Sequence, residues 1–397
     1  MIKIVVTSDN HLNKFYKKMN PEQLRKRREF LRRAFKEVVD FAINEKVDLF
    51  FQAGDLFDMP NPRNIELIFV MEQFAHLKEN GIDVFTVAGT HDSLISADED
   101  SYPIRIFEKA GFVKAFTKLQ ELEPVIWEKN GSEKVLISGI STDMRLRDRE
   151  PDPLQLLKLK NSYDGDFIKI LLLHYSVEKF AHPKAREPQI KESSLNQLPF
   201  DLYIIGHLHT NRHYDLSNKK VIIPGATERV NFGEEENDTG FYFIVIEKNK
   251  VSKVEYIKTN SQPMKSIEVI IENKTTEDPT EIIINEIKKQ SSKEQLLRCI
   301  LKGKISSDLF TQINREKILD VGNNLNFFFD LDTQNLDIYD LSTTTISSED
   351  LSIRKVLETI HNELLSQSQE QDKEILKESY EWVSSFLEKS DNFGDLL

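Results

Sequence analysis

Residues 2–11 read Ile-Lys-Ile-Val-Val-Thr-Ser-Asp-Asn-His, and this stretch decides the fold. Its short apolar, β-branched run predicts a buried β-strand, with Asp9 and His11 directly after it. Four further patches also follow apolar runs: Gly54-Asp55, Gly89-Thr90-His91-Asp92, His174 and Gly206-His207-Leu208-His209. Open α/β sheets bind their ligands at the carboxyl ends of strands. The sequence therefore predicts an α/β fold in which several strands deliver polar patches to one site.

The residue types in these patches suit divalent metal ions. Imidazoles and carboxylates without a thiolate are typical ligands of manganese, iron or zinc. The candidate ligands, enough for two ions, are Asp9, His11, Asp55, His174, His207 and His209. Taken singly, Asp55 also suits a helix N-cap and His174 a hydrogen-bonded core position. Together they favour a binuclear metal hydrolase, in which Asp55 bridges the ions and His91 acts on the phosphate without being a ligand.

The bulk composition is that of a soluble globular protein. The 397 residues suggest two or three domains, and the net charge of −13 argues against a surface that is basic throughout. The N-terminus enters a strand directly, so we expect no signal peptide, and no apolar run is long enough to span a bilayer. The single cysteine, Cys299, excludes an intramolecular disulfide and fits a reducing compartment. We expect a cytoplasmic, nucleoid-associated protein.

The order of predicted elements divides the chain into four parts. Residues 1–260 alternate strands with helical stretches, which indicates sandwiched sheets flanked by helices. The strands are expected at residues 2–8, 48–53, 84–88, 135–139, 168–173, 202–205, 221–223, 241–246 and 254–257. Residues 264–332 suit a small α+β domain of strand, helix, strand, helix and strand. A linker at 333–348 and two amphipathic helices at 349–397 complete the chain.

The patches carry a resemblance to a known family. Their order (Asp-x-His, Gly-Asp, Gly-Asn-His-Asp/Glu, His, Gly-His-x-His) resembles the signature of the calcineurin-like metallophosphoesterases, with a departure at one position. Residues 8–12, 53–57, 206–209 and 224–229 resemble more closely the DNA double-strand-break-repair nuclease family "meiotic recombination eleven", in its short archaeal form. The second domain is similar to that family's DNA-capping domain only in position and element order.

The resemblance implies a metallophosphoesterase β-sandwich flanked by helices that cleaves DNA with two Mn²⁺ ions per subunit. Asp9, His11 and His209 would hold the first ion and His174 and His207 the second, with Asp55 bridging; His91 would be the catalytic histidine. Members of the family are 3′-to-5′ exonucleases and single-strand or hairpin endonucleases. They work as homodimers, in a heterotetramer with a coiled-coil ATPase of the "Rad fifty" type. Residues 224–229 would lie beside the site and shape the DNA path.

Thr90 is the position that departs from the family pattern, where an asparagine is expected. A threonine hydroxyl is a weaker metal ligand than an amide oxygen and stands on a shorter, β-branched arm. One outcome is a weaker second ion site and a slower nuclease. The other is a DNA-binding scaffold of the same complex without catalysis. Because every other candidate ligand is retained, we favour an active enzyme.

Basic residues gather near the first patch and predict contact with DNA. Residues 14–36 hold ten Lys or Arg against Glu22 and Glu29, which suits a phosphate backbone, although a solvated helix face explains the run equally well. Arg27 and Arg28 are the residues we expect to contact DNA, together with Asn10 and Arg229.

The terminal helices predict a docking module for the ATPase partner. Their apolar stripes either pack on their own domain or dock a coiled coil, and the resemblance favours docking. The candidate contact residues are Leu357, Ile360, Leu364, Leu376, Tyr380, Val383 and Leu387.

A helix with Phe69, Val70, Phe74 and Leu77 occupies the family's dimer region, although burial in its own core explains it too. A further alternative is a phosphoesterase acting on phosphoproteins or small nucleotides; the second domain and the basic stretch argue against it.

Overall fold

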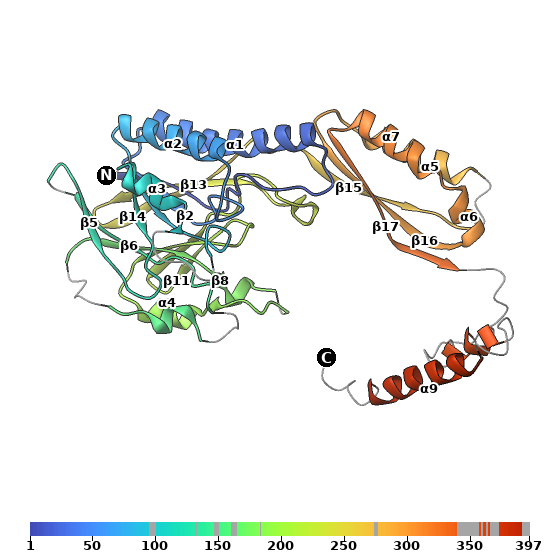
Figure 1. Ribbon diagram of the computed structural model, residues 1–397. Helices are drawn as coiled ribbons and strands as arrows, with labels where there is room; N and C mark the ends of the chain where they lie inside the picture. Colours follow the sequence, from blue (N-terminus) through green and yellow to red (C-terminus); the bar gives the residue numbers. More distant parts are fainter. Residues whose placement is uncertain are drawn as a thin grey trace. The chain divides into compact units, whose positions relative to one another are not determined.

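The structure is a computed structural model in which two compact units can be distinguished. It describes residues 1–94, 101–131, 133–146, 151–159, 165–182, 184–273, 277–339, 357–358, 360–362, 364–365 and 373–390 (Figure 1). One unit comprises Met1–Ile270, Thr280–Lys302 and Asn314–Asn335, and the other Ile271–Pro279, Gly303–Ile313 and Leu336–Leu397. Among the helices in the described ranges, none combines the length and apolar character needed to cross a membrane. The four-part division predicted from the sequence stays a prediction.

The first sheet has its strands in the order β14-β13-β1-β2-β3-β4. Their bounds are β1 (Ile2–Thr7), β2 (Leu49–Ala53), β3 (Asp83–Val87), β4 (Val113–Phe116), β13 (Gly240–Glu247) and β14 (Lys250–Lys258). Strands β1 to β4 pair in parallel, while β13 pairs antiparallel with β1 and with β14. The patches that follow β1, β2 and β3 therefore lie at the same end of the sheet.

The second sheet has the order β11-β12-β10-β7-β6-β5. Its strands are β5 (Val125–Lys129), β6 (Glu133–Gly139), β7 (Ile168–His174), β10 (Leu202–Gly206), β11 (Arg212–Leu216) and β12 (Lys219–Ile223). Strands β7 and β10 are parallel neighbours, and their register places Gly206 opposite His174. A short parallel pair, β8 (Ser176–Val177) and β9 (Gln189–Ile190), continues from β7.

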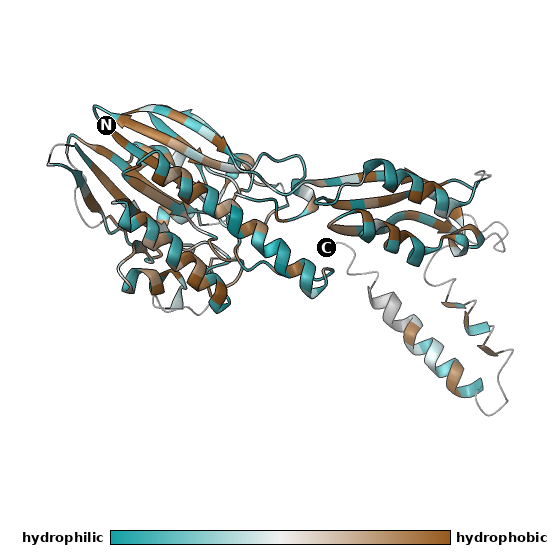
Figure 2. Cartoon of the chain, turned by 90° about the horizontal axis from the view of Figure 1, so that it is seen from above, coloured by the Kyte–Doolittle hydropathy of each residue, from teal (hydrophilic) through white to brown (hydrophobic). Residues whose placement is uncertain are grey.

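The two sheets pack face to face with helices outside them, which confirms the predicted sandwich. Ile4 and Phe51 of the first sheet share one buried cluster with Ile170 and Ile204 of the second. Helices α1 (Pro21–Asn44), α2 (Asn64–Glu79) and α3 (Ile104–Lys109) cover the other face of the first sheet, and α4 (Glu192–Gln197) lies against the second (Figure 1). Figure 2 shows strands rich in hydrophobic residues, and helices in which hydrophilic and hydrophobic residues alternate.

Helix α1 shows why these residues form an element of this length. Asn20 accepts a hydrogen bond from the backbone N–H of Gln23, whose side chain bonds back to the Asn20 backbone, and Pro21 occupies the first turn. This capping box satisfies donors that would otherwise lack partners. Leu31, Phe35 and Val38 recur at helical spacing and are fully buried, so the helix is held against the sheet by its apolar stripe.

Three strands that the sequence did not predict lie at the sheet margins. Strands β4, β5 and β11 are each the last strand of a sheet. The latter two bury little, since all residues of β5 and β11 are exposed or only partly buried. An edge strand pairs on one side only and needs no continuous apolar run. Hydrophobic patterning in the sequence therefore does not detect such strands.

Beyond residue 263 the chain forms the three-stranded sheet β15-β16-β17. The elements are β15 (Met264–Ile270), α5 (Pro279–Gln290), β16 (Leu296–Ser306), α6 (Ser307–Gln312), α7 (Arg315–Leu325) and β17 (Phe328–Tyr339). Helix α7 was not predicted. Strand β17 runs through residues 333–339, which were predicted as linker, because Leu336 is still buried on its inner side.

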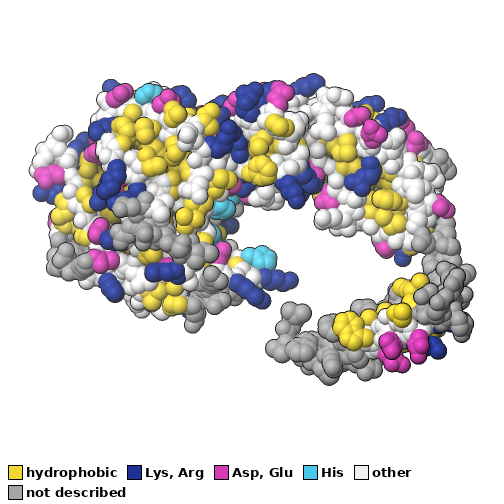
Figure 3. Space-filling view, in the orientation of Figure 1, with side chains coloured by type: hydrophobic (Ala, Val, Ile, Leu, Met, Phe, Trp, Pro, Cys, Tyr) yellow, Lys and Arg dark blue, Asp and Glu magenta, His cyan; other side chains and the backbone are white. Residues whose placement is uncertain are grey.

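The terminal segment is described in part. Helix α9 spans Lys373–Ser390, and the His361 ring stacks on Tyr380 with centroids 4.3 Å apart. Ile360 and Leu364 are about half exposed, while Leu357, Leu376 and Val383 are partly buried. Figure 3 shows hydrophobic and acidic side chains on different sides of α9. The side chain of Leu387 lies outside the described residues. So do residues 340–348, which make up most of the linker predicted at 333–348.

Candidate metal centre

The loops after the strands turn sharply at the residues predicted to bind metal. Asp9, His11, Asp55 and His207 all have positive φ, at 50°, 46°, 51° and 94°. Such backbone is costly for residues with a Cβ and persists where surrounding contacts fix it. Here the backbone N–H of His207 donates to both carboxylate oxygens of Asp9 at 3.1 Å, which ties the loop after β10 to the loop after β1. Four of the six predicted ligands therefore have backbone of this kind.

Glycines let these loops approach one another. A Cβ at Gly89 would meet the backbone and carboxylate of Asp55, and a Cβ at Gly206 would meet the carbonyl of Ala53 and the ring of His174. Only glycine leaves room for such approaches. Three of the sequence patches begin with a glycine, and two of these glycines, Gly89 and Gly206, allow the loops of the site to come into contact.

Asp9, His11 and His209 form the first ligand group, with one ligand atom from each within 4.8 Å of the others. The Nε2 atoms of His11 and His209 face each other at 3.0 Å. Their Nδ1 atoms lie against carboxylates, Asp58 for His11 at 3.1 Å and Glu234 for His209 at 2.9 Å. If each Nδ1 donates its proton there, both Nε2 atoms present lone pairs to the same point. A shared cation satisfies that arrangement, and carboxylate-oriented histidines are typical of metal sites.

Asp55, His174 and His207 form the second group by the same criterion. The Nδ1 of fully buried His174 lies 2.8 Å from the carbonyl of Ala53 and donates to it. Its Nε2 is buried without a hydrogen-bond partner, 3.2 Å from an Asp55 oxygen but outside hydrogen-bond geometry. The same Asp55 oxygen is 3.8 Å from the Nε2 of His11. Asp55 therefore stands between the groups, and the orphaned nitrogen fits a metal ion.

Burial and neighbouring charges shift the pKa values of several residues in this cluster. Burial alone would lower the pKa of His174, but the adjacent Asp55 carboxylate raises it to about 9. Burial would likewise raise the pKa of Asp55, yet His174 and then His11 hold it well below the usual range. Burial also lowers the pKa of His11 in spite of its bond to Asp58. The charge that Asp55 favours on His174 is thus of the sign that a divalent cation would supply at this place.

Asp92 is a site residue whose role the sequence did not predict, although it ends the third patch. Its buried carboxylate accepts three backbone N–H groups, from Leu56 at 3.1 Å, Phe57 at 2.9 Å and Gly89 at 3.1 Å. Burial, together with the nearby charge of Asp55, raises the pKa of Asp92 to about 6. Asp92 thus joins the loop that carries Asp55 to the loop that carries His91. Asp58 and Glu234, which orient histidines, were missed as well.

His91 lies at the mouth of the site with 46% of its side chain exposed. Its backbone N–H donates to Asp55 at 2.7 Å, and its Nδ1 lies 3.2 Å from the carbonyl of Asp58. With His11 and Asp58 it makes a third group of possible ligands, but this group shares His11 with the first. The predicted catalytic role of His91 stays a prediction that this exposed position supports.

Thr90 lies beside the second group. Its hydroxyl is 3.4 Å from the Nδ1 of His207, at the margin of hydrogen-bond distance. Thr90, His174 and His207 line a cavity of about 360 Å³ together with Thr142, Asp143, Met144, Leu146, Tyr175, Ser176, Arg186, Glu187 and Pro188. Position 90 thus lies next to the second group, and its role as a ligand stays a prediction.

Three of the residues predicted to contact DNA are buried, and the prediction is wrong for them. Arg27 is fully buried and bonds to Gln262 at 2.9 Å and pairs with Glu228 at 3.4 Å. Arg28 is 7% exposed and donates to the carbonyl of Lys14 at 3.0 Å. Asn10 is fully buried among side chains of the strand ends, including Thr7 and Thr227. These groups hold the fold together and present no surface to a phosphate.

Arg229 remains a candidate for DNA contact, because it is partly exposed and donates to Ser261 at 2.8 Å. The loop that carries it lies by the site: the N–H of Ala226 donates to the carbonyl of His209 at 3.0 Å. In the predicted dimer region, Val70, Phe74 and Leu77 are fully buried in their own core, whereas Phe69 is only partly buried. Dimerisation stays a prediction.

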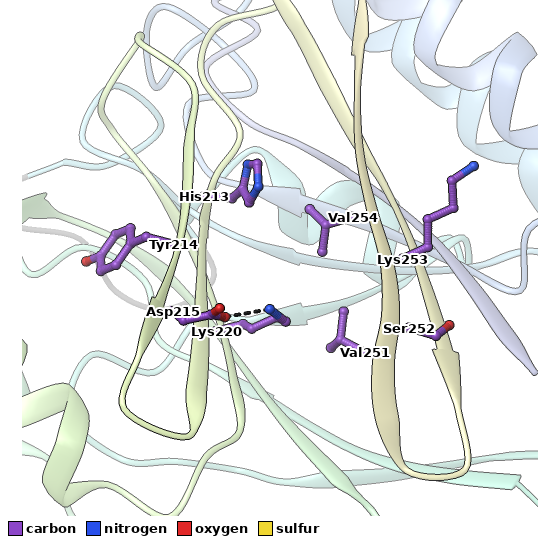
Figure 4. Close-up of a pocket in the computed structure, with 8 residues that line it drawn as sticks. All are labelled: His213, Tyr214, Asp215, Lys220, Val251, Ser252, Lys253 and Val254. Carbon is purple, nitrogen blue, oxygen red and sulfur yellow. Dashed lines mark hydrogen bonds and ion pairs between the residues drawn. The ribbon is translucent and has the colours of Figure 1, made fainter.

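A second cavity lies away from these residues. It has about 350 Å³ and is lined by His213, Tyr214, Asp215, Lys220, Val251, Ser252, Lys253 and Val254 (Figure 4). An ion pair between Lys220 and Asp215 spans part of it at 2.5 Å. This cavity shares no lining residue with the one beside His174, and we assign it no chemistry.

Comparisons with known proteins agree with this geometry. A sequence model described as calcineurin-like phosphoesterase matches residues 2–211. The chain is 27% identical over 307 residues to "DNA double-strand break repair protein Mre11" of Sulfolobus acidocaldarius, covering 75% of this chain and 74% of that protein. It is 31% identical over 220 residues to the protein of the same name from Sulfurisphaera tokodaii, covering 55% and 52%. To "Uncharacterized metallophosphoesterase YhaO" of Bacillus subtilis it is 27% identical over 219 residues, covering 55% and 50%. The chain thus spans about half the length of the last two.

Proposed function

The chain belongs to the calcineurin-like phosphoesterase family, and we propose that it is a manganese-dependent DNA nuclease of double-strand-break repair. Family membership supports a metal-dependent phosphodiesterase. The observation that carries the proposal is the position of Asp55 between two groups of ligands, one with His11 and one with His174. The Mre11 proteins to which the chain is similar support DNA as the substrate.

In this proposal each ion has its own group of ligands. Asp9, His11 and His209 would hold the first, His174 and His207 the second, and Asp55 both. When bound, such ions lower the pKa of a water nucleophile and stabilise charge on the phosphate oxygens. Thr90 would contribute to the second ion through its hydroxyl or through a water molecule.

The chain itself orients the ligands and supplies a proton. Asp58, Glu234 and the carbonyl of Ala53 each engage one ring nitrogen of a histidine and so direct the other nitrogen inward. His91 is anchored by its backbone to Asp55, yet its ring reaches solvent at the site's mouth. From there an imidazole can donate a proton to the leaving oxygen of the phosphodiester.

Cleavage of defined DNA tests this proposal. The chain is incubated with a 3′-overhang duplex and a DNA hairpin in Mn²⁺, in Mg²⁺ and in EDTA. We expect cleavage in Mn²⁺, none in EDTA, and none by Asp55→Asn, which keeps the size of the side chain but not its charge. Hydrolysis of an aryl phosphodiester with no cleavage of DNA would refute the choice of substrate and favour a phosphoesterase of small molecules or phosphoproteins.

A DNA-binding scaffold is the second candidate, favoured by the threonine beside His207. A hydroxyl there would leave the second ion weakly held. If the wild-type chain binds DNA but cleaves none of it in saturating Mn²⁺, the scaffold is the better description.

We further propose that the terminal helices bind a coiled-coil ATPase. Exposed apolar side chains in this segment, such as Ile360, Leu364 and Ile375, support a docking role. Removal of residues 349–397 is expected to preserve Mn²⁺-dependent cleavage and to abolish binding of the ATPase in a pull-down. Retained binding would contradict the assignment.

A further inference from the structure

The histidines of the metal centre differ in how their second ring nitrogen is held. His11, His174 and His209 each use Nδ1 for a protein acceptor: Asp58, the carbonyl of Ala53, and Glu234. His207 is the exception, because its Nε2 lies 3.2 Å from a carboxylate oxygen of Glu187. Its Nδ1 therefore points the other way, toward the hydroxyl of Thr90 at 3.4 Å.

Glu187 reaches His207 from a connection that the fold places over the second group. The chain leaves β7 at His174, forms β8, and returns to pair β9 with β8 in parallel, Ser176 opposite Gln189. Ser176 and Gln189 are both buried, so the β8–β9 pair holds both ends of this connection in place. Glu187 precedes Pro188 immediately before β9, and both line the cavity that also contains Thr90.

Exposure sets Glu187 apart from the other carboxylates that orient histidines. The side chains of Asp58 and Glu234 are 12% and 10% exposed, whereas that of Glu187 is 40% exposed. Water therefore competes for Glu187 more than for the others, and its contact with His207 is the most easily removed of the set.

We propose that Glu187 is a positioning residue for the second ion, resting on the two-ion function proposed above. Its carboxylate accepts the Nε2–H of His207, which leaves Nδ1 as the nitrogen of His207 that is directed at the space beside Thr90. A carboxylate on the far nitrogen also makes an imidazole a stronger ligand. In this chain that gain offsets the weak oxygen at position 90, so that Thr90 and Glu187 act as a pair through one histidine.

Titration of the full-length chain with Mn²⁺, followed by calorimetry, tests this proposal without relying on catalysis. Removing the acceptor in Glu187→Ala is expected to weaken the second ion about tenfold to a hundredfold and to leave the first unchanged. Glu187→Gln is expected to lose less, because its amide oxygen still accepts the same N–H. Glu178→Ala is the matched control, since Glu178 is an exposed glutamate on the same connection and is expected to bind both ions as the wild type does.

The electron paramagnetic resonance signal of paired Mn²⁺ ions gives a second readout, which we expect to be lost in Glu187→Ala at Mn²⁺ concentrations that saturate the wild type. Wild-type affinity for both ions in Glu187→Ala would overturn the proposal. So would an equal loss at both sites, which a general structural defect would cause, or a Glu187→Gln variant no better than Glu187→Ala. If the wild-type chain binds two ions but cleaves no DNA, the nuclease function fails while the role of Glu187 can still be judged.

Discussion

Removal of the Asp92 carboxylate is expected to loosen the site and to destabilise the whole phosphoesterase fold. This carboxylate is fully buried and is the acceptor for the backbone N–H groups of Leu56, Phe57 and Gly89. Each buried N–H left without an acceptor costs roughly 1–3 kcal/mol. Asp92→Ala leaves all three, so we expect the free energy of unfolding to fall by about 3–5 kcal/mol, allowing for water that enters the space.

Asp92→Asn removes one hydrogen-bond acceptor but keeps the size of the side chain. One oxygen of Asp92 accepts from Leu56 and Gly89 and the other from Phe57. An asparagine can place its amide oxygen where it accepts from Leu56 and Gly89. Its NH2 group then faces the N–H of Phe57, which is left without an acceptor. The expected loss is therefore about 1–3 kcal/mol, for one unmade bond.

Urea denaturation monitored by circular dichroism measures both losses, with and without Mn²⁺. The control is Asp40→Ala, since Asp40 is an exposed aspartate paired with Lys36, and its loss is expected to change stability by less than about 0.5 kcal/mol. A change of that small size in Asp92→Ala would refute the reasoning, because three unsatisfied donors cannot be free of cost.

Three further predictions concern the site and its support. Thr90→Asn is expected to tighten the second Mn²⁺ and to raise nuclease activity; no change in a metal titration and a cleavage assay would contradict the role given to position 90. His91→Ser is expected to abolish cleavage while calorimetry still counts two ions, and the loss of an ion would instead make His91 a ligand. Arg27→Ala leaves Glu228 buried without its cation, so we expect stability to fall by about 3–5 kcal/mol, with unchanged DNA affinity in the folded fraction. Weaker DNA binding by a variant of full stability would restore Arg27 as a DNA contact.

Much of the central fold could be predicted from the sequence because its strands are buried on both faces. The runs that end at Thr7, Ala53 and His174 are mostly apolar, and each is a central strand of its sheet. Polar residues directly after such runs converge for a topological reason, since parallel neighbours end together. The candidate ligands were identified by the same pattern that defined the strands.

The residues that orient the ligands could not be predicted in this way. Glu234 lies 25 positions from the His209 that it orients, and Asp58 lies 47 from His11, in loops with no periodicity. Arg27 belongs to a run of basic residues that reads as a solvated or DNA-binding face. Its partner Glu228 is 201 positions away, so only the folded chain shows that the pair is buried.

The number of Mn²⁺ ions bound per chain tests the central claim most directly, and anomalous diffraction from a crystal soaked in Mn²⁺ measures it. Two peaks are predicted, one ringed by Asp9, His11 and His209 and the other by His174 and His207, with Asp55 contacting both. In binuclear sites of this chemistry the ions lie about 3.5–4 Å apart. A single peak, or two peaks without Asp55 between them, would contradict the account.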